Sequence, residues 1–188
     1  DSSCMERTST GVFLSSARGI TPTSDGSATQ VYWRDRLTGQ TRLVSRAVDG
    51  SPGNGNSTAP AVSADGQTVV FESVANNLSS GDTNGARDVF VWTASGNVVR
   101  LVSAGGDRAS YDAAISGDGR KVAFASDAPS FTNNLVRGTN VHLVDLASGA
   151  RTLVSKRHDN GEPAGGRFPA LSHDGSRLAF YSQGAQVV

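Results

Sequence analysis

The sequence lacks the features that mark several large classes of protein. It has one cysteine, Cys4, among 188 residues, which excludes an internal disulfide and a cysteine zinc site. No apolar run approaches the roughly 18 residues that a membrane-spanning helix needs. Lys and Arg together equal Asp and Glu, at 17 each, so a zero net charge gives no electrostatic reason to expect nucleic acid as a partner. Apolar residues at helical spacing are also missing.

Cys4 is predicted to be a free thiol close to the start of the chain. An intermolecular disulfide and a lipid attachment are the alternatives. The sequence shows no signal peptide, but this excludes little, because a mature or trimmed chain has none.

Turn-forming residues and internal repeats are plentiful. The chain has 22 glycines and many Ser, Thr, Asn and Asp residues, which indicates many tight turns and therefore many short strands. Three markers recur in the same order at intervals of roughly 55 residues. They are Ser-x-Asp-Gly at 63–66, 116–119 and 172–175; Leu-Val-Ser at 43–45, 101–103 and 153–155; and a Phe two residues before a Ser, at Phe13, Phe71, Phe124 and Phe180.

One repeat predicts four short strands. In the second copy we expect them at 60–63, 68–73, 88–93 and 98–103. The matching third strands of the sister copies are expected at 31–35 and 141–145. A repeat of about 50 residues with four antiparallel strands is typical of a β-propeller blade.

We therefore predict an all-β fold, a β-propeller segment of four-stranded antiparallel blades. The chain holds about three and a half repeats, so the ring is incomplete in this chain. The predicted division is an N-terminal extension at 1–10, blade 1 with its strands 2–4 at 11–58, blade 2 at 59–111, blade 3 at 112–166, and the start of blade 4 at 167–188.

An open ring leaves strand edges that must be paired or covered. Three explanations follow. The chain is a piece of a longer propeller; or another chain, identical or not, completes the ring; or the chain caps its own edges.

The markers resemble the TolB-like propeller repeats of bacteria, over about residues 11–183. Asn77-Leu78 and Gly81-Asp82-Thr83-Asn84-Gly85 are similar to a longer variant of these repeats in exported bacterial proteins. The resemblance implies a propeller fold and an extracytoplasmic location, periplasmic or secreted. It does not specify a function, because propellers host adaptors, binders, gating domains and enzymes.

The segment 82–88 is the best candidate for a binding site. Asp82 and Asn84 stand at alternate positions before Gly85, and Asp88 follows at the head of a strand. Oxygen ligands at alternate positions around a glycine turn are typical of Ca²⁺ loops. The alternative is an Asx-type turn, because the segment lacks the further acidic residues of a full EF-hand loop.

Other chemistry-bearing residues favour structural roles. The Ser-x-Asp-Gly motif recurs in the same turn of three copies of the repeat, and Ser172-His173-Asp174 is contiguous, so neither predicts a hydrolase triad. His142 takes the position of Tyr32 or Phe90 in the sister copies and is expected to replace a packing aromatic. His142, His158 and His173 lack the spacing of a zinc site. For Trp33 and Trp92 we expect packing between strands, with an exposed binding face as the alternative.

Taken together, these patterns predict a non-catalytic binding or scaffolding module of an exported bacterial protein. Calcium is the one cofactor considered. The expected partner is a protein, or further copies of this chain, that completes the propeller. Two alternatives remain open: an accessory propeller of a hydrolase or peptidase whose catalytic part lies elsewhere, and a structural subunit of an extracellular assembly.

Overall fold

The computed structural model describes residues 9–132 and 138–182, and these residues form short antiparallel strands joined by turns and loops. The strands are β1 (Thr10–Ser15), β2 (Gln30–Asp35), β3 (Thr41–Leu43), β4 (Ser57–Val62), β5 (Thr68–Ser73), β6 (Asp88–Thr93), β7 (Val98–Leu101), β8 (Ser110–Ile115), β9 (Lys121–Ser126), β10 (Asn140–Asp145), β11 (Arg151–Leu153), β12 (Arg167–Leu171) and β13 (Leu178–Tyr181). One short 3₁₀ helix, η1, covers Pro129–Thr132. Within the described ranges there is no helix with the length and apolar character needed to cross a membrane.

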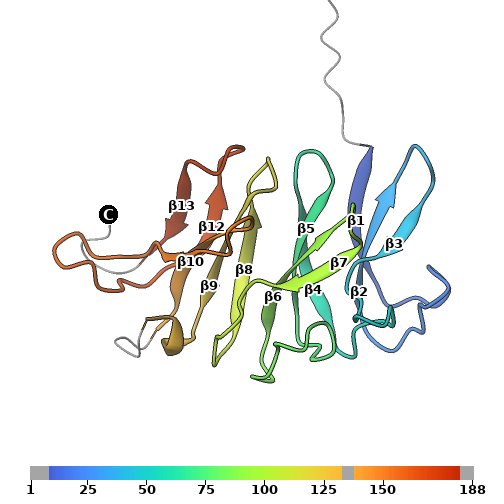
Figure 1. Cartoon of the computed structure of the whole chain (residues 1–188), viewed down its shortest axis with the longest axis horizontal. Coiled ribbons are helices and arrows are strands. Elements are labelled where there is room, and N and C mark those ends of the chain that lie inside the picture. The colour runs from blue at the N-terminus through green and yellow to red at the C-terminus, as the bar shows by residue number, and fades with distance from the viewer. Residues whose placement is uncertain (1–8, 133–137, 183–188) are drawn as a thin grey trace, which may run out of the picture.

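The strands form separate sheets that stand side by side in chain order (Figure 1). Blade 1 contains β1–β3, blade 2 contains β4–β7, blade 3 contains β8–β11, and blade 4 contains β12–β13. Blades 2 and 3 are complete four-stranded meanders, so the predicted all-β blade architecture is confirmed. Blade 1 pairs as β1-β2-β3 and lacks an inner strand in the described residues, as the repeat pattern predicts.

The first strands of blades 2, 3 and 4 carry a bulge that the sequence pattern does not reveal. Pairing of β4 with β5 shifts register between Thr58 and Ala61, and the same shift recurs in β8 and β12. Non-glycine residues with positive φ occupy the bulge, namely Ala59, Asp112 and Phe168. β4 pairs with β5 on both sides of the bulge. It therefore begins at Ser57, earlier than the predicted start at residue 60.

The core lies between blades, where apolar faces of neighbouring sheets meet. Blades 1 and 2 share a cluster that includes Val31, Phe71 and the two tryptophans. The rings of Trp33 and Trp92 lie 5.8 Å apart, and Trp33 Nε1 donates a hydrogen bond of 2.8 Å to the carbonyl of Gly66. Both side chains are buried, so the predicted packing role of the tryptophans is confirmed. A second cluster joins blades 2 and 3.

The Ser-x-Asp-Gly marker builds the turn between the first and second strands. In each copy the Ser hydroxyl donates to the Asp carboxylate and accepts the backbone N–H five residues later, at Ser63, Ser116 and Ser172. The turns also join neighbouring blades, since Ala64 N donates to Gly117 O and Asp118 N donates to His173 O, each at 2.8 Å. These bonds form a row of linked turns along one end of the blades.

The Leu-Val-Ser marker has an equally specific cause. Its buried Ser accepts a hydrogen bond from the second residue of the third strand and donates one to the side chain of the first. The three pairs of donor and acceptor side chains are Ser45 with Gln30, Ser103 with Asp88, and Ser155 with Asn140. The marker therefore ties the outer strand of each blade to the third strand.

Replacing Ser155 by Ala should destabilise the protein by about 1–3 kcal/mol, because it leaves the buried N–H of Val141 without its acceptor and removes one of the two hydrogen bonds that Asn140 Oδ1 accepts. Denaturant unfolding of the variant measures the change. Ser95→Ala, at an exposed position in the β6–β7 turn, is the control and should change stability by less than about 0.5 kcal/mol. Equal effects of the two substitutions would contradict the role given to Ser155.

His142 is packed as an aromatic side chain, as its repeat position predicts. Its ring lies 5.7 Å from Phe124 and 5.2 Å from Phe131, and its Nε2 atom is buried without a hydrogen-bond partner. Burial lowers the pKa of His142 to about 4, and the positive charge of Arg151 adds to the effect. The imidazole is therefore neutral at physiological pH.

This burial predicts acid sensitivity at one side chain. The unfolded state binds a proton at His142 near pH 6.5, and the folded state does so only near pH 4. The contribution of neutral His142 to the free energy of unfolding is therefore fully present above pH 6.5 and is lost as the pH falls towards 4. The loss amounts to about 3 kcal/mol. His142→Phe, the residue of blade 2 at this position, should remove that share of the acid loss in unfolding measured from pH 7 to pH 4. Parallel stability curves for the two proteins would contradict the assignment.

Candidate functional site

Two loops of blade 2 enclose a recess at the end of the blade opposite the linked turns. One loop joins β5 to β6 and the other joins β7 to β8 of the next blade. The recess has a volume of about 360 Å³, and its lining residues are Gly81, Asp82, Thr83, Asn84, Asp88, Leu101, Ser103, Gly105, Gly106 and Asp107. All three residues predicted from the sequence as metal ligands therefore face one cavity.

Asp88, the first residue of β6, is held at the base of the recess. Its Oδ1 accepts a hydrogen bond from the hydroxyl of Ser103, while Oδ2 is buried and has no hydrogen-bond partner. The residue is 1% exposed. Oδ1 therefore takes part in the Leu-Val-Ser hydrogen bonds, and Oδ2 is unpaired.

Asn84 links the two loops. Its Nδ2 donates to the carbonyl of Gly106 at 2.9 Å, and its Oδ1 accepts the backbone N–H of Ala86 at 2.7 Å. Gly85 follows with a φ of 64°, a left-handed conformation that glycine adopts without strain. The Asx-type turn expected as the alternative is present, and it fixes the loop around the recess.

Asp82 brings a second unpaired carboxylate oxygen. Its backbone N–H donates to the carbonyl of Ser79, while its Oδ1 is buried without a hydrogen-bond partner. Burial raises the pKa of Asp82, partly opposed by a hydrogen bond from the Asn84 backbone. Burial also raises the pKa of Asp88, opposed in part by the hydroxyl of Ser103 and the side chain of Asn84, and the negative charge of Asp82 adds a smaller increase. The residues that line the recess include these two acids and a third, Asp107, but no Lys, Arg or His.

The donor set is limited to oxygen. Asp107 lies on the lining but interacts with Ser130, whose backbone N–H it accepts at 3.3 Å. In the part of the chain that the structure describes, no three His, Cys, Asp or Glu side chains gather closely enough to hold a metal ion. Any cation here would complete its coordination with backbone oxygens and water.

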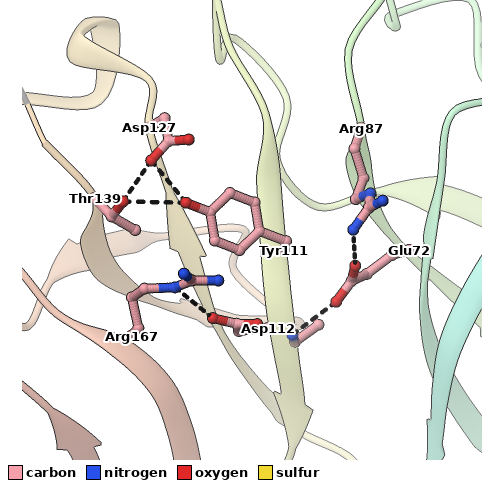
Figure 2. A network of polar contacts seen from close by, with 8 residues as sticks. Glu72, Arg87, Tyr111, Asp112, Asp127, Thr139 and Arg167 are labelled. Carbon is pink, nitrogen blue, oxygen red and sulfur yellow. Dashed lines mark hydrogen bonds and ion pairs between the residues drawn. The ribbon is translucent and has the colours of Figure 1, made fainter.

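A second polar cluster joins the inner strands of blades 2, 3 and 4 (Figure 2). Glu72 pairs with Arg87 at 3.4 Å and accepts the N–H of Ala113 from the next blade. Asp112, at the bulge of β8, pairs with Arg167 of β12 at 3.0 Å. Each ionic contact therefore lies at or beside a junction between blades.

Tyr111, Thr139 and Asp127 extend this cluster. Figure 2 shows Tyr111 and Thr139 converging on Asp127, whose Oδ1 accepts hydrogen bonds from both hydroxyls. The guanidinium of Arg167 lies 4.8 Å from the ring centre of Tyr111. Sequence reasoning missed this cluster. The available signal was a charge, such as Glu72, at a repeat position that holds Leu14, Ala125 or Tyr181 in the other copies.

Comparison with known proteins identifies the fold but no family. No family model and no curated protein matches the chain. Among solved structures, TolB from Acinetobacter baumannii is 19% identical over 95% of this chain and 37% of its own, with a TM-score of 0.52. The tricorn protease is 14% identical over 93% of this chain and 14% of its own, with a TM-score of 0.61. A prolyl endopeptidase is 19% identical over 94% and 25%, with a TM-score of 0.58.

These similarities show a shared architecture alone, since every identity is below 20%. The chain spans about a third of the length of the TolB structure and a smaller share of the peptidases. Its similarity to both TolB and peptidases leaves the activity open. The chain is therefore a segment with the β-propeller fold.

Proposed function

We propose that the chain is a non-catalytic binding and scaffolding module of an exported protein, and that its end faces pack against further propeller blades. The resemblance of its repeats to those of exported bacterial proteins supports the extracytoplasmic location. The observation that carries the proposal is a difference in burial between equivalent positions of the repeat.

Equivalent residues are buried between blades and exposed on the two end blades. Phe71 of blade 2 faces blade 1 and is fully buried, whereas its counterpart Phe13 in blade 1 is 38% exposed. Ala125 of blade 3 is fully buried, whereas its counterpart Tyr181 in blade 4 is 56% exposed. Large apolar side chains on a face that the repeat otherwise covers are typical of a contact surface.

The two end faces are complementary in kind. Inside the array, the face that carries Phe71 packs on the preceding blade, and the opposite face of each blade packs on the following one. The Phe13 face and the Tyr181 face therefore correspond to the two sides of one ordinary blade junction. Head-to-tail contact between them generates a ring when the rotation closes.

The hydrogen bonds of the Ser-x-Asp-Gly turns favour a non-catalytic role. In all three Ser-x-Asp-Gly turns, the Ser hydroxyl donates to Asp and accepts a backbone N–H. A nucleophilic serine needs its hydroxyl hydrogen-bonded to a general base such as histidine. The same contacts in every copy support a structural role for these side chains.

The 188-residue chain should associate with itself through its end faces, and light scattering over a hundredfold range of concentration measures this. We expect a mass above 19.4 kDa that rises with concentration. Tyr181→Glu and Phe13→Glu should each lower the mass, because head-to-tail contact needs both faces.

Val48→Glu is the matched control, since Val48 is an apolar residue at 88% exposure in the loop between β3 and β4. It should leave the mass unchanged. A monomer at every concentration, or equal effects of Val48→Glu and Tyr181→Glu, would overturn the proposed packing of the end faces.

A further inference from the structure

The first residue of the third strand accepts the same hydrogen bond in blades 1, 2 and 3, but among these three only blade 2 has an acid there. The residues are Gln30, Asp88 and Asn140. In each, a side-chain oxygen accepts the hydroxyl of the Leu-Val-Ser serine. A neutral amide satisfies this hydrogen bond in blades 1 and 3, so the fold does not require the negative charge of Asp88.

The second polar atom of this side chain separates the blades further. In blade 1, Gln30 Nε2 donates to the carbonyl of Gly53 at 2.7 Å, and in blade 3, Asn140 Nδ2 donates to Gly138 at 3.0 Å. The corresponding Oδ2 of Asp88 is buried without any hydrogen-bond partner. Blade 2 therefore holds an unpaired anionic oxygen where its sister blades hold a satisfied donor.

Asp82 adds a second carboxylate oxygen that lacks a hydrogen-bond partner. Asp82 Oδ1 is also buried without a hydrogen-bond partner, and both acids line the same recess. None of the lining residues is Lys, Arg or His, and no ion pair of the described residues includes Asp82 or Asp88. Buried charges in folded proteins are paired or coordinate a metal, because isolating them from water is costly.

We propose that this recess of blade 2 binds a calcium ion, with Asp82 and Asp88 as its carboxylate ligands. Asn84 acts as a positioning residue, since its amide oxygen already accepts Ala86 N and its amide nitrogen holds Gly106 of the facing loop. The ion joins the β5–β6 loop to the β7–β8 loop, and it would do so whether or not the end faces bind further blades.

The chemistry of the recess favours Ca²⁺ over other common metals. Its side-chain donors are oxygen alone, without the imidazole or thiolate that zinc prefers. Ca²⁺ accepts six to eight oxygen ligands in irregular geometry, including carbonyls and water, which suits two carboxylates on a glycine-rich loop. Mg²⁺ demands a near-ideal octahedron, which such an irregular donor set does not readily supply.

Calorimetry and thermal unfolding with CaCl₂ test the site in the chain first freed of metal with EDTA. Ca²⁺ at about a hundred times its dissociation constant should raise Tm by roughly 5–10 °C. Asp88→Asn restores the residue that blade 3 carries and keeps the acceptor for Ser103, so it should fold. It should abolish the response to Ca²⁺ and have a Tm in EDTA equal to or above that of the wild type.

Two further variants separate ligation from folding. Asp82→Asn should weaken Ca²⁺ binding at least tenfold, as expected for loss of one of two anionic ligands. Asp107→Asn is the control, because Asp107 lies on the same recess but interacts with Ser130, and it should keep the wild-type response.

The proposal is overturned if the wild-type chain shows neither heat of binding nor a Tm shift with Ca²⁺, or if Asp88→Asn responds as the wild type does. An equal or larger shift with MgCl₂ would overturn the assignment to calcium. None of these readouts depends on the mass of the particle, so failure here is distinct from failure of the proposed packing of end faces.

Discussion

Apolar contact between the faces of neighbouring sheets is the interaction on which the rest of the structure depends. Each blade is a single sheet, and its two faces pack against the sheets before and after it. Val69 and Phe71 of β5 pack towards blade 1, while the intervening Val70 packs towards blade 3. A strand buried on both faces explains why β5 and β9 read as nearly continuous apolar runs instead of alternating ones. It also explains why equivalent residues are buried in the inner blades and exposed on the end blades, as Phe71 and Phe13 are.

The repeat made most of the fold predictable from the sequence. The predicted strands at 68–73 and 88–93 coincide with β5 and β6, because the Ser-x-Asp-Gly turn precedes the first and the turn residues Ser95-Gly96 follow the second. The predicted strand at 98–103 is shorter in the structure and ends at Leu101, since Val102 and Ser103 turn inward to bond with Val89. Local patterns thus located the strands, while side-chain hydrogen bonds decided where they stop.

The candidate site was predictable only in part, for a physical reason. Spacing along one loop placed Asp82 and Asp88 together, because short loops keep close residues close. It gave no indication that Gly106 closes the recess, or that Asp112 meets Arg167, since those pairs belong to different loops or blades. Gln30 and Asn140 show that a neutral amide accepts the same hydrogen bond as Asp88, so the negative charge of Asp88 stands out only when copies of the repeat within the chain are compared.

The row of linked turns restricts where this chain accepts new sequence. Ala64 and Asp118 donate across blades to turns of identical length, so an insertion in one turn would displace its neighbour as well. The loops at the opposite end, such as the one between β5 and β6, are joined to the loops between blades through side chains, as in the hydrogen bonds between Asn54 and Asn76, and they differ in composition from copy to copy. The turns at one end are therefore restricted in length by backbone contacts, whereas the loops at the other end are joined through side chains, which substitution can change when a new recognition surface evolves.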